Sequence, residues 1–392
     1  MNSERETMDQ PPESAAAAGL RYVTDAVPGF SRRRAGRGFV FIDGDGRPVR
    51  DKNDLERIRA LVIPPAWESV WICPQSNGHL QATGRDSRSR KQYLYHKRWR
   101  EVRDESKYGR LIPFGESLSR LRRRVKRDLS LSGLPREKVL ATVVQLLDKA
   151  LIRVGNDQYA RQNGSYGLTT LRNRHVNVAG STIRFEFNGK SGKKHQVGIN
   201  DRRLARIIKQ CQEIPGYELF QYQDDDGKYQ SVDSSDVNDY LREVTGQEFT
   251  AKDFRTWAGT VAAAGALKEL GPANSGRHAK KDITATAATV AELLGNTPAV
   301  CRKCYIHPEI IEAYLDGTLR KSMTHQAGTR PAKSYGLNSE EAALLNLLRY
   351  RLGKRGQHKR RRRTKLRLRA LGKTFQRRFK DGRILELRSL EN

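Results

Sequence analysis

The sequence has little that belongs to a membrane or secreted protein. No apolar run approaches the ~20 residues that a membrane-spanning helix needs. Residues 1–18 are polar and lack the apolar stretch of a secretory signal peptide, so we expect a disordered leader there. These absences together predict a cytoplasmic location.

Cysteine is scarce, with 4 in 392 residues, and this excludes a disulfide framework. Cys301 and Cys304 form one CxxC pair. A zinc site needs two further ligands, and no second CxxC or paired His lies near them in the sequence. Clusters of Asp and Glu that would suit a divalent cation are also missing. The sequence therefore predicts reduced thiols, no metal and no other cofactor.

Acidic residues are few relative to basic ones. Lys and Arg number 74 against 44 Asp and Glu, which gives a formal charge of 74 − 44 = +30 and a pI near 10.3. An excess of this size is typical of proteins that bind a polyanion, most often nucleic acid. A soluble basic protein without such a partner would show the same balance, so the motifs must decide.

Residues 19–115 are expected to form a small β-rich N-terminal domain. Short β-like segments recur at 39–42, 70–72 and 92–95, and Asn77-Gly78 is a turn signal. The composition there is rich in Arg, Gly, Trp and Tyr.

Residues 116–325 are expected to be mainly helical, which makes the whole chain an α+β protein. Apolar residues follow helical spacing from Val139 to Leu151, and Thr250-x-x-Asp253 is a capping box that begins a later helix. Ile183, Phe185 and Phe187 alternate with polar residues, and Gly189-Lys190-Ser191-Gly192 predicts the turn of an inserted β-hairpin.

Two further helices complete this region of the sequence. A Thr- and Ala-rich stretch ends at Leu294-Gly295. Thr297 with Pro298 begins the next helix as N-cap and first residue, and Pro308 limits it.

Residues 326–392 are expected to be a basic C-terminal extension. Asn338-x-x-Glu341 caps a Leu-rich helix, and a run of Lys and Arg follows from His358. Such a run is usually a solvated tail, but on a protein that binds DNA it would contact phosphates.

Five side chains stand out as a set, although none is informative alone. Each could be a surface charge or a packing residue. Their order is what matters: an Arg at the end of a helix, a Lys on the hairpin turn, an Arg behind the capping box, an Asn after a Gly, and a Tyr nine residues later. They are Arg153, Lys190, Arg255, Asn296 and Tyr305.

This set resembles the catalytic motifs of the poxvirus-like, or bacterial, type IB DNA topoisomerases. The matching stretches are Ile152-Arg153-Val154-Gly155, Asn188-Gly189-Lys190, Lys252-Asp253-Phe254-Arg255-Thr256, and Gly295-Asn296-Thr297-Pro298 through Tyr305. Gly167-Leu168-Thr169-Thr170-Leu171 with His175 is similar to the family segment after the first Arg. The resemblance covers residues from about 60 to 315.

The resemblance implies a mainly α-helical, tyrosine-recombinase-like catalytic domain with a hairpin insertion. It implies relaxation of supercoiled duplex DNA through a 3′-phosphotyrosyl intermediate, without ATP or metal. Tyr305 would be the nucleophile and Lys190 the general acid, while Arg153 and Arg255 would stabilise the phosphorane. We expect a nucleoid-associated monomer that clamps DNA.

One position departs from the family pattern. Asn296 stands where the poxvirus enzymes have His. An amide can donate a hydrogen bond to a phosphoryl oxygen but cannot carry a titratable proton. We therefore interpret Asn296 as an oxygen-binding residue.

The segment from Gly84 to Tyr95 resembles the part of the family that contacts the recognition site in the major groove. The resemblance assigns DNA contacts to Arg88, Arg90, Tyr93 and Tyr95, and Tyr159 is expected to be a fifth. Arg can bind phosphate or guanine edges, and alternate tyrosines share one face of a strand. An edge strand with two packing tyrosines would have the same pattern.

Three other classes of protein share part of this evidence from the residues. Tyrosine recombinases use the same Arg, Lys, Arg and Tyr, but usually have His three residues before the second Arg, where this chain has Lys252. A non-enzymatic architectural DNA-binding protein would explain the charge but not the ordered set. A ribosomal or RNA-binding protein is suggested only by the basic tail.

Overall fold

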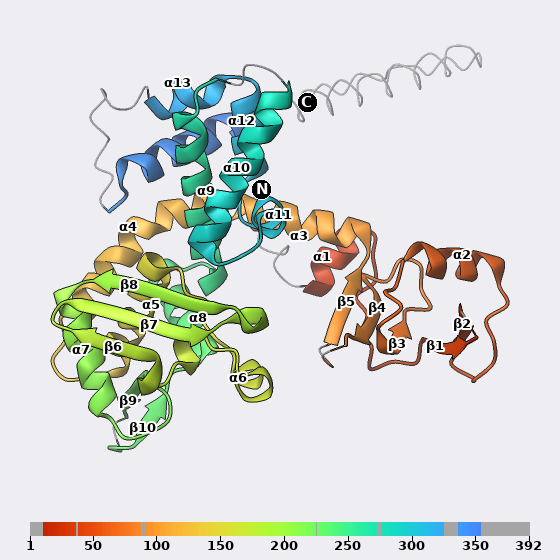
Figure 1. Cartoon of the computed structure of the whole chain (residues 1–392), viewed down its shortest axis with the longest axis horizontal. Coiled ribbons are helices and arrows are strands. Elements are labelled where there is room, and N and C mark those ends of the chain that lie inside the picture. Colours follow the sequence, from red (N-terminus) through yellow and green to blue (C-terminus); the bar gives the residue numbers. More distant parts are fainter. Residues whose placement is uncertain are drawn as a thin grey trace, which may run out of the picture. The chain divides into compact units, whose positions relative to one another are not determined.

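The computed structural model describes residues 11–353 except 37, 88, 90, 225, 273–275 and 325–335 (Figure 1). The chain divides into two compact units between Arg110 and Leu111. Each unit contains both helices and strands, which pack around cores of their own.

The first unit is built on a five-stranded antiparallel sheet with the order β2-β1-β3-β4-β5. Its strands are β1 (Phe30–Ala35), β2 (Gly38–Ile42), β3 (Glu68–Ile72), β4 (Leu80–Arg85) and β5 (Lys91–Tyr95). The three β-like segments of the sequence lie in β2, β3 and β5, so those predictions are confirmed. Helix α2 (Lys52–Ala60) places the buried Ile58 against Val70, Ile72 and Ala82 of the sheet.

The expected disordered leader is wrong for residues 11–18. Helix α1 (Pro11–Ala17) buries Ala15, and with Ala18 and Leu20 this side chain packs against Trp99 of helix α3 (Lys97–Gly109). Small alanines give a weak hydrophobic signal in the sequence, yet a large indole ring can cover them completely. Residues 1–10 lie outside the described part of the chain.

The second unit is mainly helical and begins at Leu111, not near residue 116. Its centre is formed by α4 (Leu111–Asp128), α5 (Arg136–Ala150), α8 (Ser234–Thr245) and α9 (Ala251–Glu269). The apolar face predicted between Val139 and Leu147 is buried in this core. Phe114 of α4 packs edge-on against Phe249, Phe254 and Trp257, which ties the start of the unit to α9.

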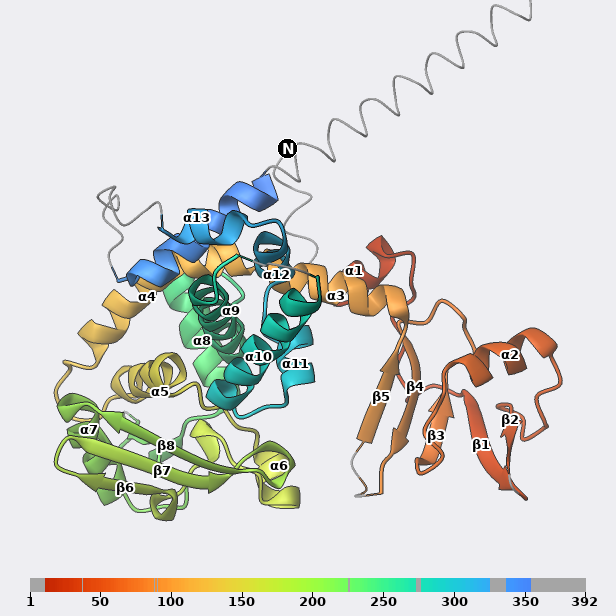
Figure 2. The ribbon, with the colours of Figure 1, turned by 45° about the horizontal axis from the view of Figure 1, so that its top comes forward.

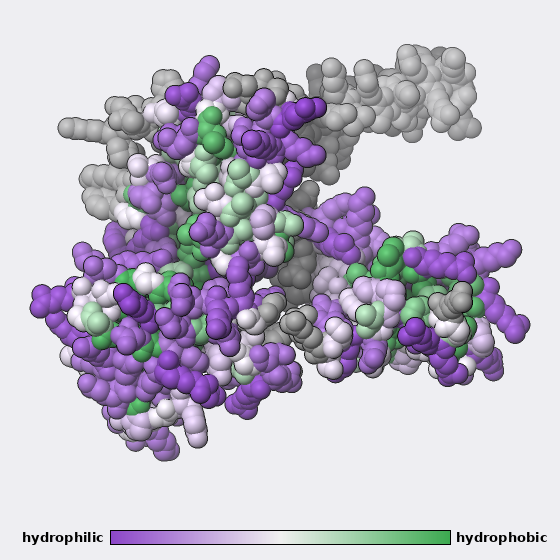
Figure 3. Space-filling model, in the orientation of Figure 1, coloured by the Kyte–Doolittle hydropathy of each residue, from purple (hydrophilic) through white to green (hydrophobic). Residues whose placement is uncertain are grey.

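A three-stranded antiparallel sheet lies beside these helices (Figure 2). It consists of β6 (Val176–Ala179), β7 (Thr182–Asn188) and β8 (Lys194–Asn200), and β7 and β8 form the predicted hairpin. Ile183, Phe185 and Phe187 face the core, where α5 and α7 (Arg202–Glu213) pack. The alternate residues of β7 are exposed, and the space-filling view is strongly hydrophilic over this part of the molecule (Figure 3).

Further elements complete the second unit. They are α6 (Asp157–Asn163), the paired strands β9 (Gln221–Gln223) and β10 (Tyr229–Ser231), and the helices α10 (Gly276–Leu294), α11 (Pro298–Cys304), α12 (Pro308–Leu315) and α13 (Thr318–Thr324). The ends of α10 and α11 agree with the sequence signals. No helix in the described ranges is long and apolar enough to cross a membrane.

Residues 338–353 belong to the core of the second unit and are not an appended extension. Asn338 and Glu341 form the predicted cap, with the backbone N–H of each donating to the side chain of the other. Residues 339–353 are helical, and Leu344, Leu345, Leu347 and Leu348 are buried in the main core. The boundary expected at 326 is therefore too early, because the basic run beyond this helix dominates the composition of the whole segment. Residues 354–392 lie outside the described part.

Candidate active site

Helix α9 places the guanidinium of Arg255 in the interior of the second unit. The backbone N–H of Thr250 donates to the Asp253 carboxylate over 2.7 Å, which fixes the start of the helix at Ala251, four residues before Arg255. Arg255 is only 4% exposed, and it donates to the carbonyl oxygens of Leu151 and Leu294, the latter over 2.6 Å. These two carbonyls end α5 and α10, so Arg255 joins three helices.

Arg153 follows α5 on a short segment whose backbone is hydrogen-bonded to residues 168 and 169. Its carbonyl accepts the backbone N–H of Leu168 over 2.9 Å, and the carbonyl of Val154 accepts that of Thr169 over 2.7 Å. The approach is so close that a Cβ added at Gly167 would lie 2.6 Å from the Arg153 oxygen. The segment from Gly167 to Thr170 therefore holds the backbone of Arg153 in place.

Asn296 lies on the loop between α10 and α11. Gly295 has a φ of +57°, a left-handed conformation that ends α10 and turns the chain. The side-chain oxygen of Asn296 accepts a hydrogen bond from Arg153 Nη2 over 2.9 Å. The amide nitrogen of Asn296 is therefore the end of the side chain that can donate.

Tyr305 ends α11, and its backbone is held by α9. Its N–H donates to the carbonyl of Cys301 over 2.9 Å, and its carbonyl accepts the hydroxyl of Thr260 over 3.2 Å. A Cβ added at Gly259 would lie 2.8 Å from the Tyr305 oxygen, so the tyrosine backbone rests directly on that glycine. The guanidinium carbon of Arg255 lies 5.4 Å from the centre of the Tyr305 ring.

The electrostatics reflect a crowded cationic centre. Burial lowers the pKa of Arg255, the neighbouring charge of Arg153 lowers it further, and the Tyr305 phenol opposes both effects. Two buried N–H groups, Arg255 Nε and Asn296 Nδ2, have no hydrogen-bond partner among the described residues. Unpaired buried donors are costly, and in a cationic centre they are suited to an anionic oxygen.

Lys190 occupies the exposed turn of the β7–β8 hairpin. The turn is closed by Gly189, whose N–H donates to the Lys193 carbonyl over 2.8 Å. No hydrogen bond joins Lys190 to the other four residues in the part of the chain that the structure describes. The structure thus joins Arg153 to Asn296 and Arg255 to Tyr305 by direct contacts, and the two arginines interact electrostatically. It leaves Lys190 on a neighbouring loop.

His195 is a residue at this centre that the motifs did not indicate. It stands at the start of β8 and stacks on Phe187 with ring centres 5.3 Å apart. Burial lowers the pKa of His195, and the charges of Arg153, Arg255 and Lys193 lower it further. The only feature of the sequence that could have indicated His195 is its position five residues after Lys190, directly behind the hairpin turn.

The expected DNA contacts of the first unit are partly described. Tyr93 and Tyr95 lie on the same face of the edge strand β5, with parallel rings 6.0 Å apart. Tyr93 is 47% exposed, whereas Tyr95 is half-buried and packs against the cluster of α1 and α3. Arg88 and Arg90 lie outside the described residues, and Tyr159 lies on α6 with its side chain outside them.

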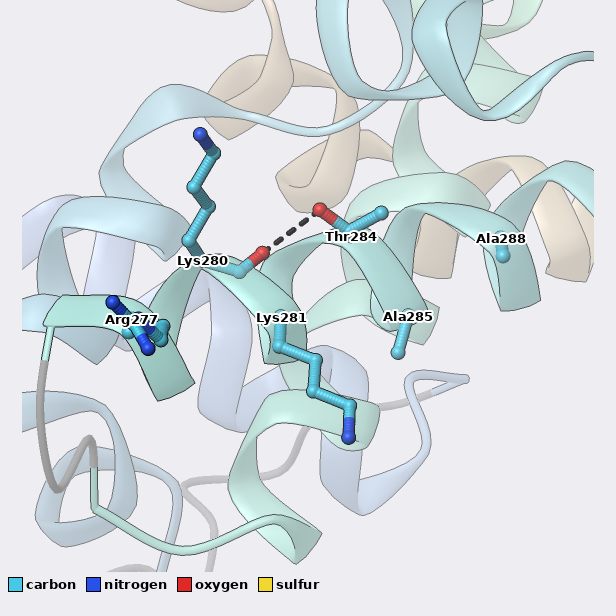
Figure 4. A pocket seen from close by; sticks show the side chains of 6 residues that line it. All are labelled: Arg277, Lys280, Lys281, Thr284, Ala285 and Ala288. Carbon is cyan, nitrogen blue, oxygen red and sulfur yellow. Dashed lines mark hydrogen bonds between the residues drawn. The ribbon is translucent and has the colours of Figure 1, made fainter.

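A shallow hollow runs along the exposed face of α10, and none of the five predicted catalytic residues lines it. Figure 4 shows Arg277, Lys280 and Lys281 over its first two turns, followed by small side chains at Thr284, Ala285 and Ala288. The Thr284 hydroxyl bonds to the Lys280 carbonyl over 2.8 Å. The lining offers three cationic side chains and no carboxylate, so it suits an anionic surface.

Comparison with protein families gives two matches along the chain. Residues 96–329 match the catalytic core of eukaryotic DNA topoisomerase I, and residues 38–86 match the N-terminal domain of bacterial DNA topoisomerase IB. The first match covers all five predicted catalytic residues.

Individual relatives agree with the family matches. DNA topoisomerase 1B of Acanthamoeba polyphaga mimivirus is 34% identical over 296 residues, which is 74% of this chain and 88% of that protein. DNA topoisomerase 1B of vaccinia virus, strain Copenhagen, is 23% identical over 71% of this chain and 88% of that protein. DNA topoisomerase 1 of Mycosarcoma maydis is 25% identical over 42% of this chain and 18% of that protein. With Arg153 bonded to Asn296, Arg255 in contact with Tyr305, family matches over residues 38–86 and 96–329, and the mimivirus relative, the chain belongs to the type IB DNA topoisomerases.

Proposed function

We propose that this topoisomerase relaxes supercoiled duplex DNA through a 3′-phosphotyrosyl intermediate in which Tyr305 is the nucleophile. The observation that carries the proposal is the contact between the Arg255 guanidinium and the Tyr305 ring, 5.4 Å from charge to ring centre. A phosphodiester bound there would place its phosphorus beside the phenol and its oxygens beside two arginines.

The cleavage step is a single exchange of ester bonds. The Tyr305 phenol oxygen bonds to phosphorus as the bond from phosphorus to the 5′ oxygen breaks, and the phenol proton is released to water. Lys190 gives a proton to the departing 5′ oxygen, which leaves a free 5′-hydroxyl. Resealing is the reverse reaction, in which that hydroxyl attacks phosphorus and restores the phenol.

The arginines and Asn296 would stabilise the pentacoordinate phosphorane. Arg153 and Arg255 supply permanent positive charge, and the unpaired N–H groups of Arg255 Nε and Asn296 Nδ2 supply buried donors. Together with Lys190 these cations balance the developing negative charge by themselves. The phosphotyrosyl ester conserves the energy of the broken bond, so resealing needs no ATP.

The same proposal covers the architecture around the site. The second unit would act as a tyrosine-recombinase-like catalytic domain, and the two units of a monomer would clamp duplex DNA. Tyr93 on β5 and the basic first turns of α10 are exposed and suited to contact it. Between cleavage and resealing the nicked strand would swivel and release supercoils, in the cytoplasm at the nucleoid.

The test is relaxation of plasmid DNA of either supercoil sign in EDTA without ATP. Swivelling around one intact strand has no sign preference, so both substrates should relax. Tyr305→Phe keeps the ring that packs on Arg255 and loses only the nucleophilic oxygen, so it should bind DNA and form no covalent adduct. An absolute requirement for ATP or Mg²⁺, or relaxation by Tyr305→Phe, would refute the proposal.

A further inference from the structure

The imidazole of His195 fills a slot between two loops of the proposed active site. One wall is Gly189, at the start of the turn that carries Lys190, and the other is Gly295, directly before Asn296. The face of the ring rests on Phe187, whose side chain is buried in the main core. The ring thus connects the hairpin turn to the loop between α10 and α11.

Both walls touch the ring so closely that neither could carry a side chain. A Cβ added at Gly189 would lie 2.4 Å from His195 Cδ2 and 2.6 Å from Nε2. A Cβ added at Gly295 would lie 2.4 Å from His195 Cε1. Gly189 has an extended backbone with φ −92°, which any residue adopts, so the reason for glycine there is the imidazole.

The surroundings of the ring are cationic. Arg153 follows α5, Arg255 lies on α9, and Lys193 belongs to the same hairpin turn, and all three disfavour a proton on His195. The neutral imidazole is therefore a spacer that adds no charge to a centre already holding two arginines. The contacts that the structure records for this side chain are packing contacts with Phe187, Gly189 and Gly295.

We propose that His195 is a positioning residue that docks the hairpin turn against the Gly295–Asn296 loop and so sets Lys190 in place to protonate the leaving 5′ oxygen. This inference rests on the proposed role of Lys190 as general acid. If the hairpin turn were held only by its own two strands, the position of the Lys190 side chain relative to the leaving oxygen would vary. Misplacement of a reacting group by about 1 Å typically costs about 10² in rate.

The experiment compares single-turnover cleavage of a normal duplex with cleavage of one whose scissile 5′ oxygen is replaced by sulfur. A thiolate leaves without a proton, so the sulfur substrate does not need a general acid. His195→Ala should slow cleavage of the oxygen substrate by about 10²-fold. It should cleave the sulfur substrate nearly as fast as the unaltered enzyme, with unchanged DNA affinity and unfolding temperature.

Lys190→Ala serves as the reference that separates the two proposals. If Lys190→Ala is slow on both substrates, Lys190 is not the general acid and the premise fails. If Lys190→Ala recovers on the sulfur substrate and His195→Ala does not, the premise stands and the positioning role of His195 is overturned. Undiminished cleavage of the oxygen substrate by His195→Ala would overturn it as well.

Glycine variants keep the inference testable should His195→Ala fold poorly. Gly189→Ala pushes its new methyl group into the imidazole and should show the same selective loss on the oxygen substrate. Gly198→Ala is the matched control, because it lies on β8 with open space around its Cβ position. In the double variant Gly189→Ala with His195→Ala, the clash is gone, so the loss should equal that of His195→Ala alone. Additive losses would show that the two residues do not act through each other.

Discussion

At the scale of single residues, the proposed site depends on which N–H groups face the phosphate. Arg255 donates one hydrogen bond to each of two backbone carbonyls, and these contacts fix the direction of its remaining N–H groups. Arg153 is held by its hydrogen bond to Asn296. The cations are therefore positioned by the protein before any DNA arrives, which is the condition under which electrostatic stabilisation is strongest.

Substitution of either arginine should slow chemistry far more than it weakens binding. Loss of one such donor typically costs about 10²–10³ in rate, so Arg153→Ala and Arg255→Ala should each show a deficit of that size in single-turnover cleavage at saturating protein. Arg184→Ala is a suitable control, because Arg184 is an exposed arginine on β7. Equal losses in affinity and rate would instead identify Arg153 and Arg255 as DNA-gripping residues.

The side-chain oxygen and the side-chain nitrogen of Asn296 can be tested separately. A neutral His can accept from Arg153 with one nitrogen and donate with the other, so Asn296→His should remain active. Asn296→Asp keeps the size and the acceptor for Arg153 but loses the N–H, and we expect cleavage to fall by about 10²–10³. Both variants are compared with the unaltered enzyme by covalent-adduct formation over time. An inactive but folded His variant, or an active Asp variant, would contradict the oxygen-binding role.

The sequence predicted the site at this scale better than its surroundings. Their order along the chain and its resemblance to the family motifs grouped Arg153, Lys190, Arg255, Asn296 and Tyr305, and local signals such as the capping box at Thr250 helped to place them on elements. His195 escaped notice because its partners, Phe187, Gly189 and Gly295, become neighbours only when the hairpin meets the loop after α10. A contact of that kind leaves no local pattern in the sequence.

At the scale of elements, the helix of residues 339–353 supports α9, the helix that carries Arg255. The Glu341 carboxylate accepts from Trp257 Nε1 over 3.1 Å and from both terminal nitrogens of Arg122 over 2.8 Å. Arg122 also pairs with Asp148 of α5. One ion cluster therefore joins α4, α5, α9 and the C-terminal helix, which the sequence could not show because its members are far apart along the chain.

Loss of the Glu341 charge should destabilise the second unit. Burial alone would raise the pKa of Glu341, but the hydrogen bonds and charge of Arg122 outweigh burial and lower it. The charged form therefore contributes stability above the unfolded pKa of about 4.3, and this contribution is lost as the pH falls through the lower folded value. Glu341→Gln should cost roughly 1–3 kcal/mol at pH 7.

The measurement is urea unfolding of both proteins from pH 7 down to pH 3. The difference between them should shrink at the acid end, where Glu341 of the unaltered protein takes up a proton. Glu340→Gln is the control, because the side chain of Glu340, next to Glu341 in the sequence, is exposed. This substitution should change the free energy of unfolding little. A difference that stays constant with pH would show that the ion pair contributes nothing specific to the charged state.

At the scale of the whole molecule, the division into two units and the basic charge bear on how DNA is held. The β-rich and helical halves were predictable because strand alternation and helical periodicity are local signals. The packing of α1 on Trp99 and of the C-terminal helix in the main core were not, because they depend on partners elsewhere in the chain. The formal charge of +30 is a property of the full chain, and its basic C-terminal run lies beyond this core.

Removal of residues 354–392 should weaken DNA binding and leave the chemistry intact. The predicted catalytic residues end at Tyr305, and Leu348 is the last buried residue of the core among the described residues, which end at 353. Each Lys or Arg that neutralises a phosphate contributes about −0.9 to the slope of log affinity against log salt. The truncated protein should therefore show a flatter salt dependence, while single-turnover cleavage of a short duplex at saturating protein should change little.

A longer truncation provides the contrast that makes this prediction sharp. Removal of residues 337–392 also deletes Glu341 and the buried leucines of the last helix, together with Arg351, which pairs with Glu309 of α12 over 2.8 Å. We expect that protein to unfold at a clearly lower temperature and to lose cleavage, since α9 loses its support. An unchanged salt slope in the shorter truncation would mean that the basic run does not contact DNA. Loss of cleavage in the shorter truncation despite saturation would mean that residues 354–392 support the catalytic unit, as the helix before them does.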